Sequence, residues 1–298
     1  MDSGVTLARL YTESRYHGQL LHPQAIEFDG ALLKELQGDV SDKIALTLLK
    51  ELGLSRMPSS SVIHDNGCGY GAVTMAVMAA EPPAGVQIHA TDINEMYLAE
   101  LKATLAKNPT WPVKIETMDA CALTFPDNTF DLSVATFVFA GLADDVAAAS
   151  HVRRTLKPGR TGVIAVWKDM PWHAALENAH YKIRGADEPM APFLSMTWYK
   201  KNEVAKDAEA GGWSPDELEF VEKAEWLNLG PDLKRWATIA WSFLAKPAGG
   251  WQQRDEDRWD EAVDSIVEEL GQDAWHKVED GVHKIRMVAD VTIMRKQG

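Results

Sequence analysis

The chain has 298 residues and a mass of 33.0 kDa, with an ordinary globular balance of 46% hydrophobic and 25% charged residues. Its formal net charge of -14 and pI near 5.1 argue against a nucleic-acid partner, because such proteins usually carry a basic stripe. No apolar run reaches the roughly 18 residues of a membrane span, and the N-terminus lacks the order of a signal peptide. We therefore expect a cytoplasmic protein with a small-molecule substrate and no membrane partner, present as a monomer or homodimer.

The first expected element is an amphipathic helix from Ser41 to Leu52, which places Ile44, Leu48 and Leu49 on one face, with Ser41 as its N-cap. A short strand through Val62 and Ile63 follows, then a glycine-rich turn and an Ala/Met-rich helix that stops at "EPP".

The same alternation then repeats along the chain. Strands are expected at "VQIHAT", "VKIET", "DLSVATF" and "TGVIAVW", and helices at residues 96–106 and 144–156. Strands that alternate with helices at this spacing predict a parallel sheet covered on both faces. The expected fold is an α/β, Rossmann-like, doubly wound arrangement.

Beyond Trp167 the pattern loosens. "MTWYKKNEVAKDAEAGGW" predicts a helix, and "FVEKAEWLNL" and "IRMVADVTIM" predict the sixth and seventh strands of a mostly parallel, seven-stranded sheet. Two helical patterns lie between those strands, and the second carries an apolar stripe from Trp259 to Leu270. We expect an N-terminal helical cap (1–57), a core (58–229 and 284–298) and a helical lid insert (230–283).

Eleven tryptophans are unusually many, and six of them lie in the last quarter: Trp226, Trp236, Trp241, Trp251, Trp259 and Trp275. They fit either core packing or an aromatic-walled pocket. The two cysteines, Cys68 and Cys121, form no paired metal-binding spacing and are expected to be free thiols.

The stretch "DNGCGYG" carries the strongest chemical signal. A strand that ends in a glycine turn and opens a helix directs backbone N–H groups at whatever lies above it, which indicates a nucleotide-like cofactor. Asp92 ends the second strand, where its carboxylate can accept hydrogen bonds from both ribose hydroxyls or cap the next helix. Both features suit a dinucleotide as well as S-adenosylmethionine.

Asp65 discriminates between these two cofactors. It precedes the first glycine by two residues, and a negative charge there would repel a pyrophosphate and attract a cationic ligand. S-adenosylmethionine carries a sulfonium and an ammonium group and no phosphate. Alternatively, Asp65 hydrogen-bonds the amides of the turn itself.

These residues resemble the D-x-G-x-G-x-G motif of class I S-adenosylmethionine-dependent methyltransferases. "ATDIN", "IETMDACAL", "FPDNTFDLSVATFVF" and "LKPGR" are similar to further segments of that family, in the same order. The likeness covers residues 60–170 well and 197–229 loosely. Asn66, His64 and Arg160 depart from the usual residues, which hints at a divergent member.

The resemblance implies S-adenosylmethionine as cofactor and a set of cofactor-binding positions. The methionine end would lie over the turn, the ribose on Asp92, the adenine between Ile93 and the 118–120 segment, and Thr136 and Phe137 beside the sulfonium. In full, the expected residues are Asp65, Asn66, Gly67, Cys68, Gly69, Gly71, Asp92, Ile93, Met118, Asp119, Ala120, Thr136 and Phe137.

The methyl acceptor is less constrained. The segment "TFVFAG" lacks the [DN]-P-P-[YF] signal of enzymes that methylate base or glutamine nitrogens, so an oxygen or nitrogen of a small aromatic or apolar metabolite is favoured, as in secondary metabolism. No metal is expected, since Asp144 and Asp145 more naturally begin a helix. His17 and His173 are candidates for a general base, and His22 also lies near the expected rim.

Three alternatives stay open. An NAD-dependent oxidoreductase could use the same turn, although no tyrosine is followed by lysine four positions later. A relative could bind the sulfonium cofactor and catalyse a rearrangement without methylation. A catalytically silent subunit of a larger transferase is the third.

Overall fold

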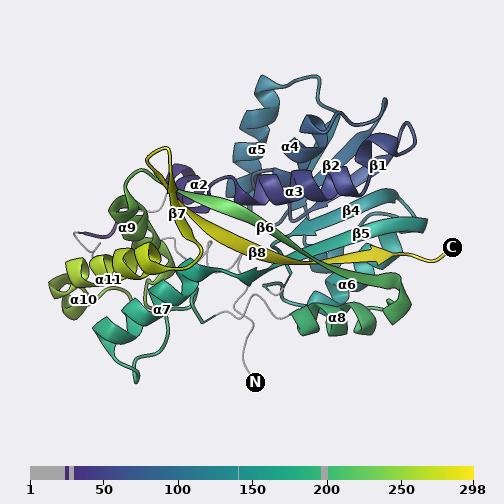
Figure 1. Ribbon diagram of the computed structural model, residues 1–298. Helices are drawn as coiled ribbons and strands as arrows, with labels where there is room; N and C mark the ends of the chain where they lie inside the picture. Colours follow the sequence, from purple (N-terminus) through teal and green to yellow (C-terminus); the bar gives the residue numbers. More distant parts are fainter. Residues whose placement is uncertain (1–23, 27–29, 140, 196–200) are drawn as a thin grey trace.

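The computed structural model describes residues 24–26, 30–139, 141–195 and 201–298 (Figure 1). Its strands are β1 (Val62–Asn66), β2 (Gln87–Asp92), β3 (Val113–Thr117), β4 (Phe130–Thr136), β5 (Leu156–Asp169), β6 (Leu218–Gly230), β7 (His276–Glu279) and β8 (Val282–Arg295). They form one eight-stranded sheet in the order β3-β2-β1-β4-β5-β8-β6, and β7 pairs with β8 off this path. The first five strands in this order, β3, β2, β1, β4 and β5, pair in parallel. Strand β8 is antiparallel to both β5 and β6.

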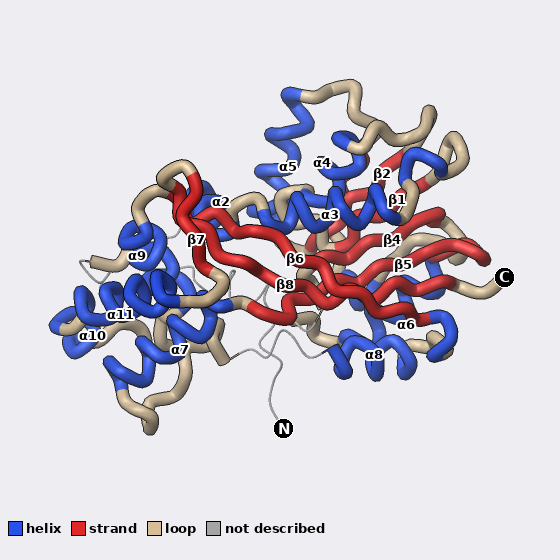
Figure 2. Tube along the Cα trace, viewed as in Figure 1, coloured by secondary structure: helices blue, strands red, loops and turns tan. Residues whose placement is uncertain are grey.

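Helices cover both faces of the sheet. They are α2 (Gly30–Gln37), α3 (Val40–Glu51), α4 (Ala72–Ala79), α5 (Glu95–Lys107), α6 (Asp145–Thr155), α7 (Pro171–Arg184), α8 (Lys201–Ala210), α9 (Leu233–Leu244), α10 (Gln253–Asp257) and α11 (Trp259–Gln272), with short 3₁₀ turns at Leu54–Arg56, Ala120–Ala122 and Pro215–Glu217. Helices α3, α4 and α5 lie on one side and α6 and α8 on the other (Figures 1 and 2). The expected doubly wound α/β fold is confirmed.

The sheet differs from the expected one by the added strand β7. It pairs with β8 through a tight turn at Asp280 and Gly281, both of which have positive φ angles of 52° and 75°. An Asp-Gly pair is a strong hairpin signal, because this turn needs positive φ at both central residues. The strand count of seven was therefore one short, although the hairpin signal was present in the sequence.

Two helices also depart from the expected pattern. Helix α3 begins at Val40 with Asp39 as N-cap, so the expectation that Ser41 caps it was wrong; Ser41 lies inside the first turn. Helix α7 was not expected at all. It begins with Pro171 at its first position and ends before Gly185, which are ordinary start and stop signals. Helix α7 packs against α11, and α2 packs against α9.

Helices α7, α9, α10 and α11 form a layer at one end of the molecule, beside the extended β6–β8 pair (Figure 2). A buried ion pair ties this layer together: Arg184 Nε on α7 donates to Asp255 Oδ1 on α10 at 2.8 Å, and both side chains are 0% exposed. The guanidinium also lies over the rings of Trp241 and Trp251. Among the described residues, no helix has the length and apolar character needed to cross a membrane.

Candidate active site

A cavity of about 390 Å³ opens above the carboxyl ends of β1, β2, β4 and β5. This is the edge at which parallel α/β sheets bind ligands, and the volume falls within the range of small-molecule sites. One part of its wall, which we call the glycine-turn side, is formed by Gly67, Cys68, Gly69, Asp92, Ile93, Asn94 and Asp119. Another part, the apolar side, includes Leu36, Val40, Trp167, Met170, Trp172, Phe193, Leu227, Trp236, Leu244 and Met287.

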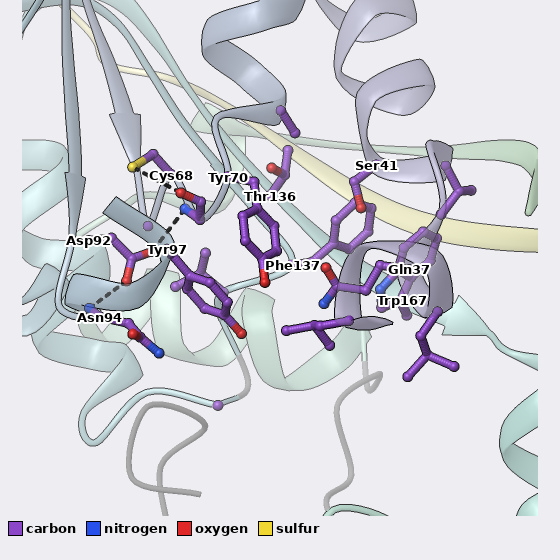
Figure 3. A pocket seen from close by; sticks show the side chains of 18 of the residues that line it. Gln37, Ser41, Cys68, Tyr70, Asp92, Asn94, Tyr97, Thr136, Phe137 and Trp167 are labelled. Carbon is purple, nitrogen blue, oxygen red and sulfur yellow. Dashed lines mark hydrogen bonds between the residues drawn. The ribbon is translucent and has the colours of Figure 1, made fainter. Parts of the chain in front are cut away.

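Asp92 ties the glycine turn to the end of β2. Its Oδ2 accepts a hydrogen bond from Gly69 N at 2.9 Å, and its Oδ1 accepts one from Asn94 N at 2.8 Å (Figure 3). Burial raises the pKa of this carboxyl group despite these bonds. The helix cap that the sequence offered as an alternative role belongs to Asn94, whose Oδ1 accepts from Met96 N.

The three glycines of the turn serve different purposes. A Cβ atom on Gly67 would collide with the side chain of Val138, and one on Gly71 would lie 2.5 Å from Leu101 Cδ1. Both glycines therefore permit close packing within the protein. Gly69 has a φ of 52° and no atom within 4 Å of its missing Cβ, and it lines the cavity. A side chain at Gly69 would meet open space, so a ligand can approach the backbone closely there.

Asp65 lies beneath the turn and is 1% exposed. Its Oδ2 accepts hydrogen bonds from Thr74 N at 2.9 Å and from Thr74 Oγ1 at 2.6 Å, within the first turn of α4. Burial raises the pKa of Asp65 to about 7, with a further contribution from the nearby charge of Asp92. Asp65 thus hydrogen-bonds the first turn of α4 and not the amides of the glycine turn itself, which the sequence analysis gave as the alternative.

Two buried amides indicate what the glycine-turn side can hold. The side-chain nitrogen of Asn94 is buried without a hydrogen-bond partner, and Asn94 lines the cavity. Both polar atoms of the Asn66 side chain are also buried without a partner. Unsatisfied buried polar groups are costly, so they commonly mark places where a ligand or water completes the network. The bare Gly69 backbone, Asp92, Asp119 and the Asn94 amide therefore fit a polar nucleoside.

Residues 63–159 match the family described as "Methyltransferase domain". A ubiquinone/menaquinone biosynthesis C-methyltransferase from Cupriavidus pinatubonensis is 34% identical over 192 residues, which cover 58% of this chain and 71% of that protein. This chain belongs to the class I S-adenosylmethionine-dependent methyltransferases. The cofactor expected from the sequence is the methyl donor that defines this class, and the match does not favour the NAD-dependent alternative.

Two further proteins show how far the likeness extends. The 2-methyl-6-phytyl-1,4-hydroquinone methyltransferase of Synechocystis is 25% identical over 206 residues, covering 67% of this chain but 59% of that protein's length. The solved structure of the YcgJ protein from Bacillus subtilis has a TM-score of 0.54 and 14% identity, covering 86% of this chain and 100% of the other. The latter likeness shows that the two proteins share a fold.

The expected cofactor positions fall into two groups in this methyltransferase. Those that line the cavity are Gly67, Cys68, Gly69, Asp92, Ile93, Asp119, Thr136 and Phe137. Those outside its lining are Asp65, Asn66, Gly71, Met118 and Ala120. Cofactor contact by the first group stays a prediction, whereas Gly71 is better explained by its packing on Leu101.

The expected general bases gain no support. His17 and His22 lie outside the described residues. His173 is buried in α7, where its Nε2 lies 3.1 Å from Leu194 O and its Nδ1 lies 3.4 Å from Glu177 Oε2. It does not line the cavity, and burial lowers its pKa. The structure therefore gives His173 a packing role.

The remaining expectations on side chains have mixed outcomes. Cys68 and Cys121 are free thiols, as expected, and burial raises the pKa of Cys121 to about 11. Asp144 caps α6 by accepting from Ala147 N at 2.8 Å. Of the six late tryptophans only Trp236 lines the cavity, while Trp241 and Trp259 are in the core.

Sequence reasoning missed the apolar side almost completely. Trp167 and Trp172 line the cavity. The position of Trp167 at the end of an expected strand was a signal that could have placed it there. Phe137 was expected, but not its conformation: φ is 61°, and its ring stacks on Trp167 with centroids 3.8 Å apart and planes 6° from parallel. Phe137 N donates to Ala165 O at 2.7 Å, which fixes this turn at the end of β4.

Proposed function

We propose that this methyltransferase transfers a methyl group from S-adenosylmethionine to a small aromatic or apolar metabolite. One observation carries the proposal: the glycine turn, with Asp92 and Asp119, shares a single cavity with a wall of buried aromatic and aliphatic side chains. The polar part fits the cofactor, and the apolar part fits the acceptor.

S-adenosylmethionine supplies an activated methyl group on a cationic sulfur. The chain has to bind the cofactor, orient the acceptor for in-line attack and exclude water. Gly69 offers its bare backbone, Asp92 a carboxylate, and Asn94 an amide nitrogen without a protein partner. When ionised, Asp65 adds a buried negative charge under the turn, which favours a cationic ligand.

The choice of acceptor atom is supported by the names of the relatives and not by this chain alone. The sequence analysis favoured oxygen or nitrogen, whereas the Cupriavidus relative is named a C-methyltransferase and the Synechocystis relative acts on a hydroquinone. We place a carbon of a hydroxylated aromatic ring first, with oxygen or nitrogen as the alternative. Such rings are planar and largely apolar, which suits the Phe137–Trp167 wall.

We also propose that residues 230–283 act as a lid over the apolar side, with 1–57 as a cap. Trp236 and Leu244 of α9 contribute to the cavity wall, and the Arg184–Asp255 pair anchors the neighbouring α10 to α7. An anchored roof of this kind would exclude water from the acceptor without large movement.

The proposal is tested by calorimetry followed by product analysis. Titration with S-adenosylmethionine and S-adenosylhomocysteine should give saturable binding, and incubation with a metabolite extract should give a product heavier by one CH₂. Transfer of a ¹³C-labelled methyl group would then distinguish a carbon-bound from an oxygen- or nitrogen-bound methyl by its chemical shift. Absence of cofactor binding to well-folded protein would refute the proposed function.

A further inference from the structure

The corner between α2 and α3 brings two uncommitted polar side chains to the cavity. Gln37 is the last residue of α2 and Ser41 lies in the first turn of α3, and both line the cavity. Figure 3 shows them on the same side as Phe137 and Trp167, away from Asp92 and Asn94. Neither side chain hydrogen-bonds another described residue, so both are available to a ligand.

This corner is held firmly in place. Trp236 Nε1 of α9 donates to Leu36 O at 3.3 Å. Gly38 is packed so closely that a Cβ there would lie 2.9 Å from Leu227 Cδ1 on β6. Arg235 donates two hydrogen bonds to Glu35, at 2.7 and 2.9 Å. The backbone of Gln37 is therefore held by contacts that do not involve its own side chain, so binding a ligand to that side chain requires no backbone rearrangement.

A flat aromatic surface faces the same part of the cavity. Phe137 and Trp167 stack in parallel at the adjacent ends of β4 and β5. Phe137 holds this orientation with a left-handed backbone, a conformation that bulky residues rarely adopt and that tends to occur at functional positions. A planar ring can extend the stack.

The wall next to the corner is apolar. Leu227, Trp236, Leu244 and Met287 line the cavity and are buried. Leu227 touches the corner at Gly38, and Trp236 touches it at Leu36. A chain that leaves a ring bound beside Gln37 would therefore meet hydrocarbon surface rather than charge.

We propose that the acceptor is an amphiphile of defined build: a planar ring bearing a hydroxyl or carbonyl oxygen, attached to an apolar chain. The ring stacks on Phe137 and Trp167, its oxygen hydrogen-bonds Gln37 and Ser41, and its chain lies along Leu227, Trp236, Leu244 and Met287. Gln37 is thus a specificity-determining residue. This assignment rests on the proposed function for its reaction, but it is testable through binding alone.

The test measures acceptor binding by calorimetry, with and without saturating S-adenosylhomocysteine. The probes are 1,4-hydroquinones that carry n-alkyl groups of increasing length, together with their ring-saturated 1,4-cyclohexanediol counterparts. Each methylene that becomes buried should tighten the dissociation constant by up to about fourfold. The hydroquinones should bind more tightly than the saturated compounds, because only a planar ring extends the stack.

One variant tests the contact with the ring oxygen, and a second serves as its control. Gln37→Leu should weaken every hydroquinone by a similar factor, roughly 2- to 10-fold, because it removes the hydrogen bond to the ring oxygen. Gln272→Leu is the matched control, since Gln272 is likewise an exposed last residue of a helix, α11, and does not line the cavity. It should leave all the dissociation constants unchanged.

Several outcomes would overturn the assignment: no binding by any hydroquinone, affinity independent of chain length, equal affinity for saturated rings, or an unchanged affinity in Gln37→Leu. The proposed function fails in a different way, through absence of S-adenosylhomocysteine binding. Acceptor titrations without cofactor still report on the chain and ring preferences in that case, so the two failures are distinguishable.

Discussion

The glycine-turn side and the apolar side of the cavity are built in opposite ways. The glycine-turn side comes from residues 67–119, which follow one another through β1, β2 and β3. The apolar side combines α2 and α3 with the end of β5, α7, β6, α9 and β8, so that Leu36 and Met287 share one wall. One side is made by backbone and carboxylates of a local motif, and the other by long-range packing.

This difference predicts how each side should respond to mutation. Damage to the turn should weaken cofactor binding while the fold persists. Damage to the packed layer should reduce stability and acceptor binding while cofactor binding persists in the folded fraction. Five such responses follow, from the largest expected effect to the smallest.

The largest effect should come from Asp255→Asn, which leaves Arg184 charged and buried. Breaking such a pair costs about 3–5 kcal/mol of unfolding free energy, measured by urea denaturation. Asp264→Asn is the control, since Asp264 pairs with Lys234 in the same layer but the two side chains are 63% and 55% exposed. It should cost less than about 1 kcal/mol. Equal losses in the two variants would contradict a stabilising role for the buried pair.

The next effect concerns the bare position of the turn. Gly69→Ala should weaken S-adenosylmethionine binding about 10- to 100-fold, because a methyl group would enter the space of the cofactor at an overpacking cost of about 1–3 kcal/mol. Gly159→Ala is a close match, with a φ of 72° against 52° and equally open surroundings. The two variants should lose similar amounts of stability, and only Gly69→Ala should lose affinity for S-adenosylmethionine. Unimpaired calorimetric binding by Gly69→Ala would place the cofactor elsewhere.

A pH dependence should follow from Asp65, whose pKa is raised to about 7 by burial. Below pH 7 the carboxyl is increasingly neutral and attracts a sulfonium less, so affinity for S-adenosylmethionine should fall up to about tenfold between pH 8 and 6. S-adenosylhomocysteine, which lacks the sulfonium charge, should show a smaller slope. Asp65→Asn should abolish the difference in pH dependence of affinity between the two ligands.

The same group predicts a stability change of defined sign. Because the folded pKa of Asp65 lies above the unfolded value, the folded state binds the extra proton between about pH 4 and 7. The destabilising contribution of Asp65 therefore grows as pH rises through that window and is complete above it. Relative to the wild type, the melting temperature of Asp65→Asn should rise from pH 5 to pH 8; a fall would contradict the raised pKa.

The smallest effect should come from Glu35→Gln, which weakens the exposed bond between α2 and α9. The Arg235 hydrogen bonds lower the pKa of Glu35, so the stabilisation is present at neutral pH and is lost in acid. Exposed pairs contribute about 0.2–1 kcal/mol. We expect a similarly small loss of stability and a slight rise in acceptor KM, with cofactor affinity unchanged. A large change in cofactor affinity would show that the two sides of the cavity are not independent.

The sequence by itself determined the fold class and the glycine-turn side. Strand-helix alternation, the turn after β1 and Asp92 at the end of β2 are local signals, and a parallel sheet brings the ends of consecutive strands to one edge. The contact of Asp92 with the Gly69 amide follows from that geometry. Even β7 was within reach, since Asp280 and Gly281 carry a hairpin signal.

Only the tertiary structure decided the roles of individual side chains. Asp65 became a buried partner of Thr74, Gly71 a contact for Leu101, and His173 a packing residue of α7. The apolar side depends on contacts between residues some 200 positions apart, such as Trp236 with Leu36. Periodicity marks which face of a helix is apolar, but not which distant face it covers, because many packings bury the same area and shape complementarity selects one.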